Sequence, residues 1–244
     1  MKKVLLSAIA ALAIVGTTSA QNDWANYGRY EKANKEVKTW PQEKRKVVFM
    51  GNSITDNWAY RHPDFFNNNG YVGRGIGGQT TYQMVLRFYE DVINLKPKAV
   101  VINGGTNDIA LNNHPYVEDR TFQNICTMAQ MAKQNNIKVI LTSITPCEKY
   151  VWRPDVTDAI EKIQHLNARI KEYAKKNKFQ YVDYYAAMVE IDANGKVTGR
   201  MRPGISDKRK DADGNEVDEG CHPNLVGYGI MEPLVQAAIK KVVK

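Results

Sequence analysis

The feature that most constrains the fold of this chain is a short apolar run that leads into glycine, asparagine and serine. Residues 47–50 read Val-Val-Phe-Met, and Gly51, Asn52 and Ser53 follow directly. The run is uninterrupted and too short for a helix of its own, which is typical of a buried strand in a parallel sheet. Glycine lets the chain turn at the strand's end, the edge where open α/β sheets bind ligands. Ser53 is therefore a candidate functional residue, although this tripeptide equally suits the N-terminal cap of a following helix.

The rest of the chain alternates between strand-like and helix-like patterns. Further buried strands are expected at residues 71–76, 99–102, 137–142 and 179–182. Helices are expected from Thr80 to Val92, over 119–134 and 158–176, and at the C-terminus, broken or restarted at Pro233. Five strands alternating with helices indicate an α/β fold in three layers, with a doubly wound five-stranded parallel sheet, because parallel neighbours need helical crossovers. Tight-turn signals within 190–219 predict hairpins or irregular loops there.

The N-terminus has the three-part layout of a secretory signal peptide. Two lysines precede an apolar run over residues 4–15, and small residues follow up to Ala20. The run is too short to span a bilayer comfortably, so we expect cleavage, a mature protein that begins near Gln21, and a periplasmic or extracellular location. The chain then divides into a signal peptide (1–20), an N-terminal helical extension (21–45) and a main domain (46–244). Apolar and aromatic residues at helical spacing predict an amphipathic helix over about 23–37.

Composition argues against several classes of partner. The net charge is +8, two of these charges lie in the signal peptide, and the other basic residues are scattered. A nucleic-acid groove needs a basic face interleaved with aromatic residues, so we expect no nucleic-acid partner. No later stretch is apolar enough to cross a membrane. The acidic turn at 211–214 resembles a calcium loop superficially, but Arg209 and Gly220 would occupy positions that require carboxylates, so no metal site is expected.

The chain has three cysteines, which is an odd number. Cys126 falls on the apolar face of a predicted helix, where a buried free thiol is expected. Cys147 and Cys221 each follow core elements near the functional edge. They can pair in an oxidising compartment, but the sequence alone does not decide cysteine connectivity.

Polar residues suited to one chemistry follow the strand ends. Ser53 follows the first strand, Gly78 the second and Asn107 the third, while Glu219 and His222 lie just before the last helix. Ester cleavage requires a nucleophile, a base, a group that orients the base, and donors for the oxyanion. A serine hydroxyl is a poor nucleophile without a base in hydrogen-bond reach, and an imidazole exchanges protons near neutral pH. Taken alone, the His-Pro-Asn sequence at 222–224 would also suit a helix N-cap.

With these motifs in order, essentially the whole mature chain resembles an SGNH hydrolase of the GDSL family, a group of serine esterases and lipases with a flavodoxin-like sheet. Gly51-Asn52-Ser53 resembles the nucleophile block, with asparagine where the family often has aspartate. Gly78 matches the glycine whose amide helps to bind the oxyanion. Gly105-Thr106-Asn107-Asp108 matches the third block, whose asparagine donates to the same oxygen. His222 matches the base of the last block.

The resemblance implies that Ser53, His222 and Glu219 are catalytic and that Ser53, Gly78 and Asn107 form the oxyanion hole. The family's last block usually reads Asp-x-x-His, whereas here the third residue before His222 is Glu219 and Asp218 stands one place earlier. Glu219 is favoured by its spacing, and glutamate serves in other triads. No metal and no organic cofactor are implied.

Export and the aromatic residues near the predicted cleft fit a secreted serine esterase that removes O-acetyl groups from carbohydrate. A lipid-directed lysophospholipase or thioesterase is the alternative, and a carbohydrate-binding relative without turnover is a third. The substrate is a small-molecule or polysaccharide ester, and the sequence predicts no oligomeric state. Candidate cleft residues, each of which also suits loop packing or surface, are Trp58, Tyr82, Trp152, Arg153, Arg200 and Arg202. His62 and His114 are candidates for the mouth of the pocket. His165 is expected on a helix surface.

Overall fold

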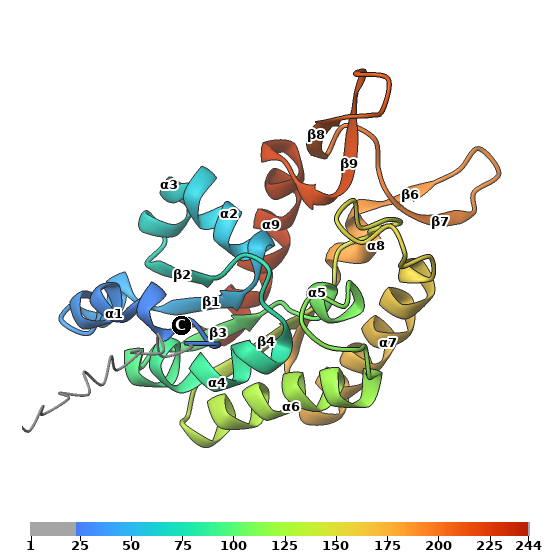
Figure 1. The fold of residues 1–244 in the computed structure, drawn as a ribbon. Helices are drawn as coiled ribbons and strands as arrows, with labels where there is room; N and C mark the ends of the chain where they lie inside the picture. The colour runs from blue at the N-terminus through green and yellow to red at the C-terminus, as the bar shows by residue number, and fades with distance from the viewer. Residues whose placement is uncertain (1–22, 244) are drawn as a thin grey trace, which may run out of the picture.

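A five-stranded parallel sheet forms the centre of the molecule (Figure 1). The computed structural model describes residues 23–243. The strands are β1 (Val47–Gly51), β2 (Tyr71–Gly75), β3 (Ala99–Ile102), β4 (Lys138–Thr142) and β5 (Gln180–Val182). They lie in the order β2-β1-β3-β4-β5, and every neighbouring pair is parallel. This is the flavodoxin-like order, so the predicted fold class is confirmed, and the strand order reverses between β1 and β3.

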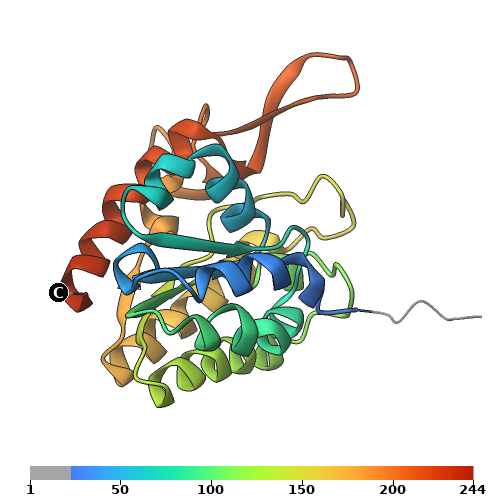
Figure 2. The ribbon, with the colours of Figure 1, turned by 90° about the vertical axis from the view of Figure 1, so that its left-hand side faces the viewer.

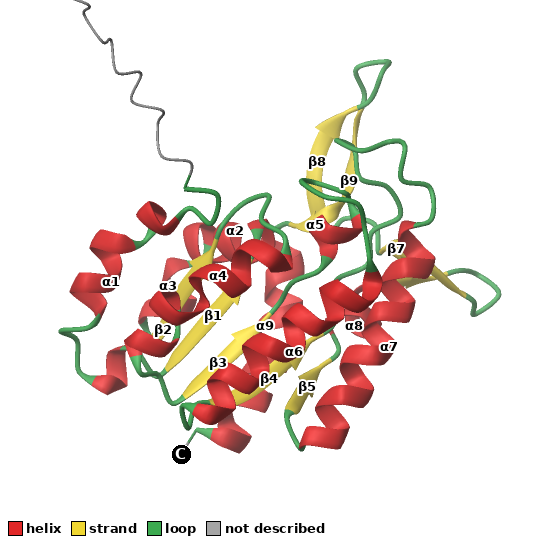
Figure 3. Cartoon of the chain, turned by 60° about the horizontal axis from the view of Figure 1, so that its bottom comes forward, coloured by secondary structure: helices red, strands yellow, loops and turns green. Residues whose placement is uncertain are grey.

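Helices cover both faces of the sheet, as Figures 2 and 3 show. Alternate residues of β1 enter two separate cores, since Val48 and Met50 face one layer while Val47 and Phe49 face the other. The first layer contains α4 (Thr81–Asp91), α6 (Glu118–Gln134) and α7 (Ala159–Asn177). The second contains α2 (Ser53–Arg61), α3 (Pro63–Asn67), α8 (Tyr184–Met188) and α9 (Leu225–Val242). Short helical turns complete the connections: η2 (Gln42–Lys44), η3 (Ile93–Leu95) and α5 (Thr106–Ile109).

Two antiparallel hairpins occupy the region where tight turns were predicted. β6 (Val189–Ile191) pairs with β7 (Val197–Met201), and β8 (Ser206–Lys210) pairs with β9 (Glu216–Pro223). Both project from the sheet's carboxyl edge on the upper right of Figure 1. The second hairpin carries the segment with Glu219 and His222, so it delivers the predicted base to that edge from outside the main sheet.

The N-terminal extension is less helical than predicted. It contains a short turn, η1 (Tyr27–Arg29), and α1 (Glu31–Val37). The expected start of the helix at residue 23 is wrong, because Asn26 adopts a left-handed conformation with φ of 57° that interrupts a regular helix. The extension nevertheless packs on the sheet: the Tyr30 hydroxyl donates to the Gly75 carbonyl, and the buried Asn34 amide donates to Asp91 Oδ1 at 2.6 Å.

The C-terminal helix is continuous, so the predicted break at Pro233 is wrong. Proline inside a helix costs about 3 kcal/mol, because it removes a backbone donor and its ring crowds the carbonyl four residues earlier. Here the residue four positions before the proline is Gly229. The helix buries Tyr228 and Met231 before the proline, and Val235 after it, against the sheet. Tertiary packing of this face outweighs the local cost.

The predicted signal peptide lies outside the described residues. Within residues 23–243, none of the helices combines the length and the apolar character needed to cross a membrane.

Candidate active site

Ser53 begins α2 at the carboxyl end of strand β1, which lies between β2 and β3. The side chain of Asn52 caps this helix by accepting a hydrogen bond from the Ile54 amide at 3.1 Å, so capping does not use the serine hydroxyl. A side chain at Gly51 would come within 2.1 Å of Thr55 Oγ1, which explains why the turn requires glycine. The two interpretations left open by the sequence are thereby separated: Asn52 is the cap, and Ser53 is free to engage another partner.

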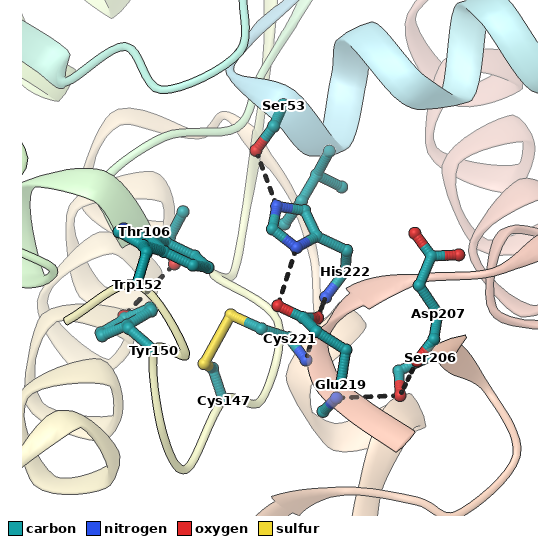
Figure 4. Close-up of polar contacts among 12 residues, drawn as sticks. Ser53, Thr106, Cys147, Tyr150, Trp152, Ser206, Asp207, Glu219, Cys221 and His222 are labelled. Atoms are coloured by element: carbon teal, nitrogen blue, oxygen red, sulfur yellow. Dashed lines mark hydrogen bonds and ion pairs between the residues drawn. A yellow bond between two sulfur atoms is a disulfide. The ribbon is translucent and has the colours of Figure 1, made fainter. Parts of the chain in front are cut away.

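That partner is His222, 169 residues further along the chain. Ser53 Oγ and His222 Nε2 are 3.0 Å apart, and His222 Nδ1 lies 3.0 Å from Glu219 Oε1 (Figure 4). Both distances are within hydrogen-bond reach. The imidazole therefore bridges a hydroxyl and a carboxylate in the order that a proton-relaying base requires.

Glu219, and not Asp218, faces the imidazole. Its other oxygen, Oε2, accepts hydrogen bonds from the backbone amides of His222 at 2.6 Å and Cys221 at 2.9 Å. Burial alone would raise the pKa of the Glu219 carboxyl, but the His222 side chain and these amides together hold that pKa below its ordinary value. Asp218 instead pairs with Lys208 at 2.7 Å and accepts from the Gly204 amide at 2.7 Å.

A disulfide joins Cys147, in the loop after β4, to Cys221, the residue directly before His222 (Figure 4). It answers the question of pairing that the sequence left open. Cys126 is a free thiol, and the prediction that it is buried is only partly right, because the side chain is half-buried. The disulfide links the hairpin that carries His222 to a loop of the main sheet.

The two predicted oxyanion loops are in direct contact. Gly78 has φ of 74°, a left-handed conformation that favours glycine, and the next residue, Gln79, accepts a hydrogen bond from Asn107 Nδ2 at 2.9 Å through its carbonyl. Asn107 is buried within α5. An amide group has two N–H donors, and the bond to Gln79 uses one of them.

Asp108, the last residue of the third block, supports this arrangement, a role that the sequence did not suggest. Its carboxylate is fully buried and accepts from the Thr81 amide at 2.9 Å and the Thr81 hydroxyl at 2.6 Å. Burial raises the pKa of the Asp108 carboxyl against the opposing effect of these hydrogen bonds. These contacts connect α5 to the start of α4. The one sequence feature that could have indicated this role is the position of an acidic residue directly after Asn107.

One of the candidate cleft side chains, Trp152, lies close to two other groups of the site. The Trp152 ring centroid is 5.5 Å from that of His222, and Trp152 Nε1 donates to Asn112 Oδ1 at 2.9 Å. Asn112 Nδ2 in turn donates to the Gly78 carbonyl at 2.9 Å. Trp152 thus contacts the ring of His222, the candidate base, and is hydrogen-bonded through Asn112 to the predicted oxyanion loop at Gly78. Asn112 is a residue that sequence reasoning missed, because a lone asparagine in a polar loop has no pattern.

Trp58 is not a cleft residue. It is 2% exposed and packs against Phe49, Phe65 and Tyr228, because α2 turns it inward from a stretch that appears polar in the sequence. His62 binds Glu232 at 2.6 Å, beside the Trp58 indole, which donates to the same carboxylate.

The remaining candidates divide between the site's surroundings and the surface. The Tyr82 and His114 rings are in tilted contact, with 4.1 Å between their centroids, and Arg153 is paired with Asp155 at 2.7 Å. Arg200 pairs with Glu190 and Arg202 donates to the Ala187 carbonyl, both on the exposed first hairpin. His165 lies on a helix surface as predicted, bound to Glu118. Within residues 23–243, no group of three or more histidine, cysteine or acidic side chains is arranged to hold a metal ion.

Comparison with known sequences places this geometry in a family. Residues 49–230, well over half of the chain, match the GDSL-like Lipase/Acylhydrolase family. The chain belongs to that family of ester-bond hydrolases. The crystal structure of a GDSL-like lipase from Bacteroides thetaiotaomicron has 49% sequence identity and a TM-score of 0.81, over 91% of this chain and 100% of that one.

Two curated relatives match more distantly. An uncharacterized lipoprotein of Bacillus subtilis is 36% identical over 117 residues, which cover 41% of this chain and 48% of the relative. An acetylxylan esterase of Xylanibacter ruminicola is 26% identical over 235 residues, which cover 80% of this chain and 43% of the relative. The chain spans less than half the length of the curated relatives it matches.

Proposed function

We propose that this protein is a serine esterase in which Ser53 is the nucleophile, His222 the general base and Glu219 the carboxylate that orients it. One observation carries the proposal: two 3.0 Å contacts link Ser53 Oγ to His222 and His222 to Glu219, across 169 residues of sequence. Such an alignment activates a hydroxyl that is otherwise a poor nucleophile.

The reaction follows from this arrangement. Ser53 Oγ attacks the ester carbonyl carbon while His222 Nε2 takes the hydroxyl proton, and Glu219 stabilises the resulting imidazolium. The amides of Ser53 and Gly78 and the Asn107 side chain stabilise the oxyanion. Collapse breaks the bond to the alcohol, which leaves with the proton from His222. Water, deprotonated by the same imidazole, then releases the acid and restores Ser53.

We further propose that the substrate is an O-acetylated carbohydrate outside the cytoplasm. The signal-peptide pattern at residues 1–20 and a relative named as a lipoprotein support export. A second relative, named as an acetylxylan esterase, supports an acetylated carbohydrate as the substrate. A lipid-directed enzyme would need an apolar channel for a long acyl chain, whereas polar side chains surround the loops beside Gly78. A binding relative without turnover is disfavoured, because the three catalytic candidates are assembled.

The esterase is tested with p-nitrophenyl acetate. Ser53→Ala should abolish the acyl-enzyme burst, and Asn107→Ala should slow turnover about 10²–10³-fold, because it removes one oxyanion donor. Retention of the burst in Ser53→Ala would remove the serine from its role, and unchanged turnover in Asn107→Ala would remove the amide from the oxyanion hole.

The substrate class is tested with acyl esters of two to twelve carbons and by acetate release from acetylated polysaccharides. Preference for the two-carbon acyl group and release of acetate support the carbohydrate esterase. A rate that rises steadily with chain length would favour the lipid-directed alternative. Export is tested by expression with residues 1–20 in place, and sequencing of the secreted protein should find its N-terminus near Gln21.

A further inference from the structure

The N-terminal extension is attached to the loops of the active site. Gln79 Nε2, beside the Gly78 loop, donates to the Ala25 carbonyl at 2.7 Å, and Gln83 Nε2 donates to the Trp24 carbonyl at 2.7 Å. The Tyr27 hydroxyl donates to the Leu86 carbonyl at 2.7 Å. Two of these bonds hold the backbone carbonyls of residues 24 and 25, and the third holds the Tyr27 side chain against α4, next to the segment that also accepts from Asn107.

A cavity of about 560 Å³ lies at this junction. Its wall combines the start of the extension, the Gly78 loop and the loop that carries Trp152, and it includes Asp23, Trp24, Gly78, Asn112, Asn113 and Trp152. Two of these residues belong to the surroundings of the proposed reaction centre, since Gly78 is an oxyanion candidate and the Trp152 ring lies 5.5 Å from that of His222. A group bound in this cavity therefore lies beside the Gly78 loop and Trp152, which border the proposed reaction centre.

Two indole rings are available on the cavity wall. Trp24 is 42% exposed and Trp152 is 37% exposed, so both leave apolar surface open to a ligand. Trp152 is held in place by Asn112, which bonds the indole N–H and the Gly78 carbonyl together. At Trp24 the bond from Gln83 anchors the backbone carbonyl rather than the indole. The exposed faces of both rings offer apolar surface to the C–H groups of a ligand.

The rest of the wall is mostly polar, with Ile76 as an aliphatic exception, and it carries one acid, Asp23, and one base, Arg153. Side-chain amides of Gln79, Gln83, Asn112 and Asn113 surround the indoles. Arg153, the basic residue of the wall, is already paired with Asp155 through two contacts of 2.9 and 2.7 Å. The amide nitrogens of Gln83, Asn112 and Asn113 each make one hydrogen bond, to Trp24, Gly78 and Gln83 respectively, and each has a second N–H to offer a ligand. An acyl chain would cover these N–H groups without an acceptor, and an anion would find the guanidinium engaged. A ring with hydroxyl groups on its edge and C–H groups on its faces matches both kinds of surface.

We propose that this cavity is a saccharide subsite, in which Trp24 and Trp152 contact the pyranose ring of the ester's alcohol part and the surrounding amides bind its hydroxyl groups. This inference rests on the proposed esterase function for its placement beside the scissile bond. It gives the N-terminal extension a role in substrate binding: the extension supplies one wall of the site.

The test compares two acetyl esters, acetylated xylo-oligosaccharide and p-nitrophenyl acetate, in the mature chain. In Trp24→Ala, the KM for the oligosaccharide should rise about ten-fold, because one aromatic contact of this size is lost. The change for p-nitrophenyl acetate should be several-fold smaller, because that substrate has no sugar ring. Trp24→Phe should recover part of the loss. Trp152→Ala should also raise the oligosaccharide KM, together with a fall in kcat that reflects its contact with His222.

Tyr60→Ala is the matched control. Tyr60 is an exposed aromatic residue of α2 that is not part of the cavity wall. Its replacement should leave the oligosaccharide KM at the wild-type value. Equal losses on both esters in Trp24→Ala, or the same loss in Tyr60→Ala, would overturn the subsite.

Binding is measured separately from turnover. Calorimetric titration of the Ser53→Ala protein with deacetylated xylo-oligosaccharide, and with manno-oligosaccharide as a second pyranose, should give saturable binding that Trp24→Ala weakens about ten-fold. Lack of binding by both sugars would contradict the subsite even if the enzyme hydrolyses p-nitrophenyl acetate. Conversely, sugar binding by a protein whose hydrolysis does not depend on Ser53 would support the subsite and refute the proposed function.

Discussion

The two halves of the candidate site are held in place by different means. Ser53 follows a strand that is completely surrounded by core side chains, and the fully buried Arg87 donates to the Gly51 carbonyl at 2.8 Å just before it. His222 ends a hairpin whose other strand, β8, is largely exposed. The hairpin is fixed by the Cys147–Cys221 disulfide and by Glu219, which accepts from two backbone amides (Figure 4).

This contrast shows how a site at the edge of a parallel sheet can be completed by a hairpin that is not part of the sheet. Burial and hydrogen bonding position Ser53, the proposed nucleophile, because the strand that precedes it pairs on both sides. The base lies outside the five-stranded sheet, so a covalent link and a local carboxylate supply the constraint that a core would otherwise provide. The following predictions separate the two halves, from the largest effect to the smallest.

Glu219→Gln should lower kcat for p-nitrophenyl acetate by about 10⁴-fold, since an amide cannot stabilise the imidazolium or impose the same tautomer. Asp218→Asn is the matched control. Its carboxylate pairs with Lys208 and does not contact His222, so turnover should stay within a few-fold of wild type. A larger loss in Asp218→Asn than in Glu219→Gln would reverse the assignment of the orienting carboxylate.

Arg87→Met tests the nucleophile half. Arg87 binds the Gly51 and Arg74 carbonyls and pairs with Asp91 at 2.7 Å, both side chains being buried. Removing one partner leaves a buried charge uncompensated, so the free energy of unfolding should fall by about 3–5 kcal/mol in urea titrations. Lys35→Met, which breaks an exposed pair with Glu31, should change it by less than about 1 kcal/mol. Equal effects would show that the buried network contributes little.

Removing the disulfide tests the base half. The double variant Cys147→Ser/Cys221→Ser should lose about 2–5 kcal/mol of stability, because the bond closes a long loop, with 74 residues of separation. Turnover should fall as well, since Cys221 directly precedes His222. Cys126→Ser, which changes the free thiol, should melt and react like wild type. Identical melting temperatures for the oxidised and reduced wild-type protein would contradict the stabilising role of the Cys147–Cys221 disulfide.

Acidification should act on the base half through Glu219. The pKa of this carboxyl is lower in the folded protein than its ordinary value of about 4.3. The ionised form therefore stabilises the fold fully above that value, and this contribution is lost as pH falls through the lowered folded-state pKa. The stability difference between wild type and Glu219→Gln should shrink below about pH 4 in thermal melts. If the stability difference between wild type and Glu219→Gln instead grows as the pH falls, the lowered pKa of Glu219 is contradicted.

The sheet was predictable because its strands are short, apolar and rich in β-branched residues, as in Val100-Val101-Ile102. The triad was predictable from the order of its motifs, although only the structure shows that Glu219, and not Asp218, contacts His222. Trp58 was misplaced because the polar residues around it conceal a helix whose inner face is Ile54, Thr55 and Trp58.

Other features depend on tertiary contacts that local patterns do not report. The disulfide joins segments 74 residues apart, and neither cysteine indicates its partner. Pro233 signals a break, but burial of α9 keeps the helix continuous. The link from Trp152 through Asn112 to Gly78 involves three loops, each unremarkable in composition.

The most direct test of the central claim is covalent labelling by a fluorophosphonate, followed by peptide mass spectrometry. The account predicts a single adduct on Ser53, formed quickly in wild type, far more slowly in His222→Ala and not at all in Ser53→Ala. An active enzyme that is labelled at another residue, or that His222→Ala leaves equally reactive, would contradict it.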